Sequence, residues 1–244
     1  MKISIITACF NNESTIKKCL DSVSQQSGDI EHILIDGLST DGTIDIIKSY
    51  PHVAFFSSEK DAGIYDALNK GLEVATGDII GFLHSDDVFY SSEILKQVSM
   101  FFQNDQSLDA IYGDIQFVDK NGKKIRYYSS KNFNKNYFSK GKMPAHTSFF
   151  AKKKVYQKFK FKLGYKIAAD FDHLLRVFYS KKYKIDYKPI LTTYMLTGGA
   201  STKNIRSRII INKEILRSCR ENGLKTNLVK VYSKYLQKIF EFKL

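Results

Sequence analysis

The stretch GDIIGFLHSDDVFY (77–90) is an apolar run that ends in two adjacent carboxylates. Its apolar part, Ile79 to Leu83, predicts a buried strand with Asp86 and Asp87 at its C-terminal end. In α/β proteins the carboxyl ends of strands are where ligands bind. The stretch therefore predicts an α/β protein with a functional site at this strand tip.

Upstream of this stretch, strand-like and helix-like segments alternate. The helix-like segments carry apolar residues at helical spacing, as Ile16, Leu20 and Val23 do. Such alternation predicts βαβ units and a mostly parallel sheet whose C-terminal strand ends meet at one edge. The predicted strands span residues 2–10, 31–37 and 52–59, and the predicted helices span residues 13–26, 40–50 and 63–77.

Downstream of the stretch the pattern is less regular. The Asn121-Gly122 pair between two apolar runs predicts a β-hairpin over residues 108–129. The other predicted elements are a helix over 91–103 capped by Ser91 or Ser92, a helix plus long loop in the segment that follows the hairpin, a helix over 169–181, a strand over 184–196, a flexible turn over 197–202, and two basic helices from Asn204 onward that join near Asn222-Gly223.

Charge is distributed unevenly along the 244 residues, whose net charge is +13. Residues 1–119 hold 7 Lys and Arg against 19 Asp and Glu, whereas residues 120–164 hold 14 Lys and Arg and no acid. A segment of this kind creates a positive field that suits phosphates or an anionic membrane surface. The alternative for the lysines is an ordinary solvated face.

Composition narrows the class of protein. A hydrophobic content of 43% is enough for one large domain, or for one domain with an appendage. Cys9, Cys19 and Cys219 form no CxxC pair and are odd in number, which predicts a reduced, cytoplasmic protein without a zinc site. No apolar run approaches the ~18 residues that a membrane span needs.

Acidic residues follow several predicted strands: Asp36 in LIDG, Glu59 and Asp61 in SSEKDAG, and the pair Asp86 and Asp87. Parallel strands bring these ends together, and clustered carboxylates are stable only with a cation among them. Mg²⁺ or Mn²⁺, which bridges protein oxygens to a diphosphate, is the simplest such cation. The alternative is that the acids cap turns and helices. The two commonest phosphate-binding loops, GxxxxGK[ST] and GxGxxG after the first strand, are absent from the sequence.

Three blocks of the first half are specific when taken in order. They are ISIITACFNNESTI (3–16), LIDGLSTDGTIDII (34–47) and DAGIYDALNKGLEVATGDIIGFLHSDD (61–87). Together they resemble the N-terminal half of family 2 glycosyltransferases of GT-A fold, especially bacterial members that build surface polysaccharides such as colanic acid, O-antigen or capsule. The resemblance is strong over residues 2–120 and reaches about residue 200 through two further motifs.

The resemblance implies a fold, an activity and partners. The fold is α/β, with a Rossmann-like, mostly parallel sheet flanked by helices. The activity is inverting transfer of a sugar from a nucleotide diphosphate donor, expected to be UDP-linked, to a glycan or lipid-linked oligosaccharide acceptor in cell-surface polysaccharide synthesis. Mn²⁺ or Mg²⁺ is the implied cofactor.

The resemblance also assigns nucleotide contacts by position. Ala8, Phe10 and Glu13 fall where the family's first loop wraps the nucleotide. Asp36 falls where a carboxylate accepts hydrogen bonds from the uracil ring, and Asp61 falls in another loop that faces the nucleotide.

HSDD (84–87) resembles the family's DxD-type motif. By this resemblance Asp86 binds the metal and the diphosphate-sugar, and Asp87 is its neighbouring metal ligand. The family often has an acid where this chain has His84, and often a proline where it has Ala8. His84 is expected to support the metal or to face the sugar, or alternatively to pack at the end of the strand.

AADFDHLLR (168–176) resembles the family's ED-x-D-L-x-x-R block, with Ala169 in place of the glutamate. The resemblance makes Asp170 the general base that removes the proton of the acceptor hydroxyl. The alternative is that Asp170 caps a helix. Asp172 and Arg176, four residues apart, are predicted to pair on one helix face.

Two further segments are compared with the acceptor side of the family. PAHTSFF (144–150) resembles the segment near the acceptor site, with His146 as its polar centre. The alternative for His146 is a hydrogen-bonded core residue. TGGAST (197–202) resembles a loop that closes over the donor, because its glycines allow the backbone to approach phosphates.

The C-terminal segment carries Lys230, Lys234 and Lys238 at intervals of four residues, with apolar residues on another face. This pattern predicts a helix that lies on an anionic membrane surface, which would place the protein at the inner face of the cell membrane. The alternative is a helix packed on the catalytic domain. The resulting domain prediction is a transferase domain over residues 1–200, with a donor half over 1–120 and an acceptor half over 121–200, followed by basic helices over 201–244.

Two other functions compete with glycosyl transfer. A nucleic-acid-binding protein would use the basic segment 120–164, yet the acidic first half would repel a polyanion and no nucleic-acid-binding motif is present in the sequence. A sugar-phosphate nucleotidyltransferase would need a Gly-rich, basic N-terminal loop, which the sequence lacks. Nucleic acid is therefore not an expected partner.

Overall fold

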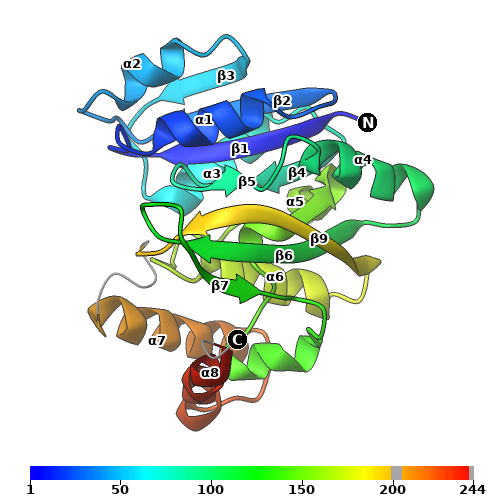
Figure 1. Ribbon diagram of the computed structural model, residues 1–244. Coiled ribbons are helices and arrows are strands. Elements are labelled where there is room, and N and C mark those ends of the chain that lie inside the picture. Colours follow the sequence, from blue (N-terminus) through cyan, green and yellow to red (C-terminus); the bar gives the residue numbers. More distant parts are fainter. Residues whose placement is uncertain (199–204, 242–244) are drawn as a thin grey trace.

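The computed structural model describes residues 1–198 and 205–241 and shows an α/β fold in which helices cover both faces of one sheet (Figure 1). Its N-terminal half alternates strands and helices, as the sequence predicts. The strands are β1 (Ile3–Cys9), β2 (Ile30–Asp36), β3 (Val53–Ser58) and β4 (Ile79–Phe82), and the helices between them are α1 (Ile16–Ser24), α2 (Thr43–Lys48) and α3 (Ile64–Val74). These four strands are parallel, so their carboxyl ends meet at one edge.

The second half extends the sheet with strands of both directions. Its elements are β5 (Val88–Phe89), α4 (Ile94–Asn104), β6 (Ala110–Val118), β7 (Lys124–Tyr128), the 3₁₀ turns η1 (Lys135–Lys140) and η2 (His146–Ser148), β8 (Phe149–Lys152), α5 (Lys153–Lys158), α6 (Ala169–Tyr179) and β9 (Ile185–Leu196). The strand order is β3-β2-β1-β4-β8-β6-β9-β5, and β7 pairs with β6 outside this order. β8 is antiparallel to β4, whereas β9 is parallel to β6.

Most predicted elements of the second half are present, and three details differ. The hairpin around Asn121-Gly122 is β6 and β7, and Gly122 has the positive φ of +80° that such a turn favours. β8 lies in the acid-free segment that was predicted as helix plus loop, because so short an apolar run has no readable period. β5 is shorter still and was not predicted as a separate strand. Glu93 precedes α4 as its cap residue, so the prediction that Ser91 or Ser92 caps this helix is wrong.

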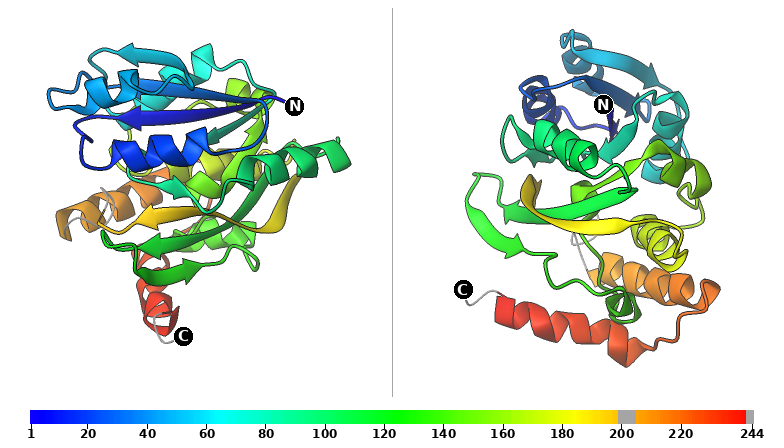
Figure 2. Two further views of the ribbon diagram at one scale, coloured as in Figure 1. Left: turned by 45° about the horizontal axis from the view of Figure 1, so that its top comes forward. Right: turned by 90° about the vertical axis from the view of Figure 1, so that its right-hand side faces the viewer.

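Helices cover both faces of the sheet (Figure 2). β1 is buried along its whole length, and its alternate side chains join two apolar clusters. Ile5 belongs to the cluster under α1 and α4, together with Val98. Ile6 belongs to the cluster under α3, together with Leu68. A Cβ atom at Gly71 would lie 2.4 Å from Cγ2 of Ile6, so glycine lets α3 pack close to the strand. This packing fixes α3 beside the carboxyl edge.

Two basic helices, α7 (Ile205–Glu221) and α8 (Leu228–Glu241), follow the sheet, as predicted. α7 packs against α6, and α8 packs against α7 and η1 (Figure 1). Ile215 and Val231 join the same buried cluster as α3 and α6. The domain boundaries at residues 120 and 200 stay a prediction. Over the two described ranges, no helix combines the length and the apolar character that crossing a membrane requires.

The lysines of α8 do not form one exposed stripe as their spacing predicts. Lys230 is exposed, whereas Lys234 is buried with its ammonium 5.2 Å from the centre of the Tyr235 ring. Lys234 turns inward because it follows buried Val231 by three residues and therefore shares its helix face. The side chains predicted to complete the stripe and its apolar face, those of Leu236, Lys238, Ile239 and Phe242, lie outside the described part.

Candidate active site

Asp36 organises the loop after β2. It is fully buried, and its carboxylate accepts hydrogen bonds from the Ser39 amide at 2.9 Å, from the Ser39 hydroxyl, and from the Ser58 hydroxyl at 2.7 Å. The thiol of Cys9 lies 3.6 Å from the same carboxylate. Both oxygens of Asp36 are thus engaged by protein donors. A contact with the uracil ring, which the sequence predicts, would require one of these donors to give way.

Glu13 joins the loop after β1 to the loop after β2. Its carboxylate accepts from the Gly42 amide at 3.1 Å, and its own amide donates to Asp41 at 3.1 Å. Ala8 is buried within β1, and Phe10 is exposed at the start of the same loop. Of the three residues predicted for this loop, Phe10 and Glu13 are exposed, and Phe10 offers a ring on which a base can stack.

Asp61 and Phe10 both lie close to Gly37. A Cβ atom at Gly37 would lie 2.8 Å from the Asp61 carboxylate and 3.4 Å from the Phe10 ring. The carboxylate of Asp61 also accepts from the Gly63 amide at 2.8 Å, which holds it at the start of α3. The structure thus brings Phe10, Gly37 and Asp61 together as a small shelf at the carboxyl edge.

The HSDD motif forms a tight turn after β4, with the Asp87 amide donating to the His84 carbonyl at 3.0 Å. Asp86 is half-buried at this turn. Asp87 is buried, and its Oδ1 accepts from the Leu196 amide at the end of β9 at 3.1 Å. Burial, and then the neighbouring Asp86, raises the pKa of Asp87 well above its ordinary value. Asp87 therefore ties the turn to β9, just before the glycine-rich segment at 197–202, of which Thr197 and Gly198 are described.

The donor set at this turn fits a metal held jointly by protein and substrate. Asp86 offers a partly exposed carboxylate, and Oδ2 of Asp87 has no hydrogen-bond partner among the described residues. Within those residues no group of three metal-binding side chains gathers. Mg²⁺ commonly takes one or two carboxylates, with substrate phosphates and water completing its coordination. The residues present therefore fit Mg²⁺ or Mn²⁺ on a diphosphate better than a metal enclosed by protein alone.

His84 and His146 face each other across the tip of β4, with ring centres 6.1 Å apart. His146 is buried and stacks on Phe82 at 4.9 Å. Burial lowers the pKa of both imidazoles, so both are neutral near pH 7. Neither ring nitrogen of His146 has a hydrogen-bond partner among the described residues. His146 is thus a core histidine without the hydrogen bonds that the alternative prediction assumed.

Aromatic contacts continue from His146 to Asp170. The ring of His146 lies 5.4 Å from that of Phe161, which stacks on Tyr65 at 5.8 Å. The Tyr65 hydroxyl lies 3.5 Å from Asp170. The structure thus connects the HSDD turn to the predicted base through side chains of three separate segments.

Asp170 lies in the first turn of α6 and is half-buried. Its carboxylate accepts from the Phe171 amide at 2.7 Å, and burial raises the pKa of Asp170 to about 6. The alternative prediction that Asp170 caps the helix is wrong, because Ala168 occupies the cap position. A carboxyl group whose pKa is about 6 matches a general base that works near neutral pH.

Comparison with known proteins then assigns the family. The family model described as glycosyl transferase family 2 matches residues 4–161. This chain belongs to that family. The enzyme is therefore a glycosyltransferase, and its residues from β1 to the connection before α6 make up the matched part.

Relatives of this glycosyltransferase support the same class. A PGL/p-HBAD biosynthesis glycosyltransferase of Mycobacterium bovis is 29% identical over 221 residues, which are 88% of this chain and 82% of the relative. An uncharacterized glycosyltransferase of Mycobacterium tuberculosis is 32% identical over 179 residues, 71% of this chain and 68% of the relative.

Solved structures show the fold of this glycosyltransferase to be GT-A, as predicted. Staphylococcus aureus TarS superimposes with a TM-score of 0.70 at 20% identity, over 99% of this chain and 44% of TarS. The mannosyltransferase PcManGT of Pyrobaculum calidifontis, solved with GDP-Man and Mn²⁺, superimposes with a TM-score of 0.64 at 18% identity, over 88% of this chain and 64% of PcManGT.

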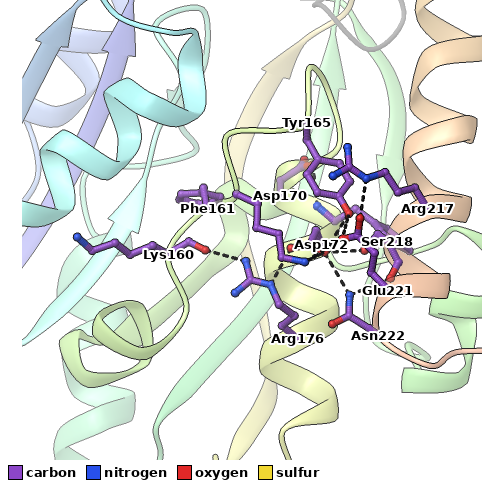
Figure 3. Close-up of polar contacts among 12 residues, drawn as sticks. Lys160, Phe161, Tyr165, Asp170, Asp172, Arg176, Arg217, Ser218, Glu221 and Asn222 are labelled. Atoms are coloured by element: carbon purple, nitrogen blue, oxygen red, sulfur yellow. Dashed lines mark hydrogen bonds and ion pairs between the residues drawn. The ribbon is translucent and has the colours of Figure 1, made fainter.

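One cluster near Asp170 of this glycosyltransferase was missed by sequence reasoning (Figure 3). The predicted pair of Asp172 and Arg176 is confirmed, with an Nε–Oδ2 distance of 2.7 Å. Asp172 is completely buried and also accepts from Ser218 at 2.9 Å and from Asn222 at 3.2 Å, both from the α7 end. These partners are 46 and 50 residues away in sequence, so no local pattern connects them to Asp172.

Proposed function

We propose that this glycosyltransferase transfers one sugar from a UDP-linked donor to a glycan acceptor with inversion at the anomeric carbon. The observation that carries the proposal is Asp170, a half-buried carboxyl with a pKa raised to about 6, connected by packed rings to the HSDD turn. Asp170 takes the proton of the acceptor hydroxyl as that oxygen attacks the sugar carbon. Such a single displacement needs no covalent enzyme intermediate.

On the donor side, we propose that the shelf of Phe10, Gly37 and Asp61 binds the nucleoside and that the HSDD turn binds the diphosphate. The ring of Phe10 and the carboxylate of Asp61 contact the nucleoside, while Asp36 and Glu13 hold the loops that carry them. Asp86 holds Mn²⁺ or Mg²⁺ with the diphosphate, and the bound metal would stabilise the negative charge of the departing nucleotide. Support comes from TarS, whose residues 1–349 were solved with UDP-GlcNAc, and from PcManGT with Mn²⁺.

The acceptor is proposed to be a surface glycan or a lipid-linked oligosaccharide. The neutral, half-buried imidazole of His84 lies at the HSDD turn, where a sugar hydroxyl would meet it, whereas His146, with its ring centre 6.1 Å away, is buried. The relatives named PGL/p-HBAD biosynthesis glycosyltransferase support a biosynthetic role. Family membership favours glycosyl transfer over nucleic-acid binding and over nucleotidyl transfer.

Thermal unfolding with a panel of nucleotide sugars tests the donor. With Mn²⁺ and a donor at about 100 times its Kd, mass action adds ~2.7 kcal/mol to the free energy of unfolding. For a chain of this length, that corresponds to a rise in Tm of roughly 5–10 °C. We expect UDP-sugars with Mn²⁺ to give this rise, and UMP to give much less because it lacks the diphosphate. A panel in which no nucleotide sugar raises the Tm would contradict the proposal.

Peripheral membrane contact is proposed for the C-terminal helices, at the cytoplasmic face of the cell membrane. Leu228, Val229 and Tyr232 expose apolar surface on α8, beside exposed Lys225 and Lys230. Each Lys or Arg near an anionic bilayer contributes ~1 kcal/mol, and the apolar side chains add burial in the interface. A lipid-linked acceptor would then meet the enzyme on one surface.

Co-sedimentation with vesicles tests this contact. We expect binding to anionic vesicles at low salt, weaker binding at high salt because of screening, and none to neutral vesicles. The double variant Lys225→Glu, Lys230→Glu should lose most of the binding. As a control, Lys18→Glu with Lys48→Glu makes the same charge change on α1 and α2, at the opposite end of the molecule (Figure 1). Full-length protein that stays in the supernatant with anionic vesicles would overturn the proposed contact.

A further inference from the structure

The backbone immediately before Asp170 is held by a side chain from the C-terminal helices. Glu214 of α7 accepts hydrogen bonds from the amides of Lys166 at 2.7 Å, Ile167 at 2.9 Å and Ala168 at 2.9 Å. These amides lie at the N-terminal end of α6, where backbone donors lack partners within the helix and where a negative charge is favourable. One carboxylate therefore satisfies three consecutive donors, two residues away from Asp170.

The same segment is held from the opposite side by α3. The Tyr65 hydroxyl donates to the Ile167 carbonyl, and its oxygen lies 3.5 Å from Asp170. Tyr65 is buried in the cluster under α3, so its ring cannot follow a shift of the segment. Ile167 thus has its amide fixed by α7 and its carbonyl fixed by α3.

α7 itself is fixed relative to α6 by the buried Asp172 cluster (Figure 3). Ser218 and Asn222 bring hydrogen bonds from the α7 side to Asp172. Tyr165 and Lys162, from the connection before α6, reach the same carboxylate at 3.3 Å and 3.4 Å. Glu214 therefore extends from a helix that cannot slide along α6 without breaking hydrogen bonds to a buried charge.

We propose that Glu214 is a positioning residue for the transfer reaction: it fixes the 166–168 backbone, and through it the carboxyl group of Asp170 relative to the acceptor hydroxyl. This inference rests on the proposed role of Asp170 as the base. Glu214 touches no reacting atom in this scheme. It acts because a displacement of about 1 Å at a reacting group can lower the rate by ~10²-fold.

Glu214 also acts on Asp170 through its charge. The titratable side chains that influence Asp170 are Tyr65 from α3 and Glu214 from α7. Burial raises the pKa of Asp170 to about 6, and the like charge of Glu214 contributes in the same direction. Removing that charge lowers the pKa of Asp170, so the base stays deprotonated to a lower pH. The acid limb of the pH–rate profile should then move to lower pH.

The test compares Glu214→Gln with the native enzyme in the presence of donor and Mn²⁺. We expect kcat to fall by roughly 10-fold or more with an unchanged donor KM, because the loss lies in orientation. The acid limb should move to lower pH, and the amides of residues 166–168 should exchange hydrogen faster. A residue that merely stabilised the fold would change the amide exchange but leave kcat and the acid limb unchanged in a protein that remains folded. Unchanged kcat and an unmoved acid limb would overturn the proposal.

Two further variants make the result decisive. Glu73→Gln removes the same charge from an exposed ion pair, in which the Glu73 carboxylate lies 3.0 Å from the ammonium of Lys160. Lys160 lies in the connection before α6. This variant should leave kcat unchanged. Tyr65→Phe removes the hydroxyl that binds the Ile167 carbonyl and introduces no unpaired charge. It therefore tests the positioning role if Glu214→Gln fails to fold. We expect Tyr65→Phe also to lower kcat at constant donor KM. Native kcat in this variant would contradict the proposal that the 166–168 backbone is held in place for the reaction.

The outcome for Asp170 separates this inference from the proposed function. If Asp170→Asn is inactive while Glu214→Gln behaves as the native enzyme, only the positioning role is lost. If Asp170→Asn turns over normally, the assignment of the base fails first, whatever Glu214→Gln does.

Discussion

Asp170→Asn is expected to lower turnover by ~10²-fold or more while donor affinity stays unchanged. Asparagine has the shape of aspartate and can still accept the hydrogen bond from the Phe171 amide, so the first turn of α6 should be preserved. It cannot take a proton from the acceptor hydroxyl. The comparison is between kcat from sugar transfer and Kd for UDP from calorimetry. Near-native turnover in a folded variant would show that another group is the base.

The pH dependence offers a second measurement on the same group. Burial raises the pKa of Asp170 to about 6, and only the deprotonated form can act as a base. The value of kcat/KM should therefore fall as the pH decreases through about 6, and should become nearly level about one pH unit above that value. In Asp170→Asn the residual rate should lose this acid limb. An acid limb that persists in the variant would have to come from a different titrating group.

Asp86→Ala is expected to abolish transfer together with metal-dependent binding of UDP. The alanine removes the partly exposed carboxylate of the HSDD turn, while the hydrogen bond from the Asp87 amide to the His84 carbonyl remains to keep the turn closed. Calorimetry with UDP in the presence and absence of Mn²⁺ measures the effect. Unchanged Mn²⁺-dependent affinity in the variant would contradict the role of Asp86.

Asp78, at the other end of the same strand, provides a matched control for Asp86→Ala. Asp78 precedes β4 at its N-terminal end, is exposed, and accepts from the Lys2 amide at 3.0 Å. Asp78→Ala removes one carboxylate beside β4, as Asp86→Ala does, but at the edge opposite to the proposed donor site. It should leave UDP affinity unchanged, so a loss of affinity in both variants would indicate a general electrostatic effect of the acidic half.

The parts of the fold that were predictable are those with a repeating pattern. β1 to β3 and the helices that follow them alternate in a readable pattern, and Asn121-Gly122 has a turn chemistry of its own. β4 has only four residues and was predicted from the apolar run that ends in the acidic pair. β5 spans Val88–Phe89 and β8 spans Phe149–Lys152, which are lengths at which no period can be read.

For the candidate site, the sequence predicted the positions of the acidic residues at strand ends but not the groups that surround them. The position of Asp36 at a strand end could be read from LIDG, whereas its enclosure by Ser39 and Ser58 depends on how two loops fold together. Lys234 was expected on one exposed stripe with Lys230, facing an anionic membrane surface, yet the packing of α8 buries it. Glu214 carries no local signal, since its partners precede it by 46 to 48 residues.

The burial of Asp172 has a consequence for chimaeric enzymes. The family match ends at residue 161, which invites exchange of the matched part for that of a relative with another donor. Residues 162 and 165 lie beyond that point and bind Asp172 together with residues from the α7 end. Removing a partner from a buried charge costs ~3–5 kcal/mol, a large share of the ~5–15 kcal/mol that holds a typical domain folded.

A junction near residue 161 keeps Asp172 and the partners named above in the same parent, and the hydrogen bond of this cluster that it crosses runs from Arg176 to the Lys160 backbone carbonyl, a group that any incoming residue also has. A junction between α6 and α7 would instead separate Asp172 from Ser218 and Asn222, and a library shuffled there should yield mostly insoluble protein unless the incoming part restores those hydrogen bonds. Junctions inside the exposed turn at residues 120–122 also leave the cluster with a single parent, so the first half could be exchanged without removing a partner of Asp172.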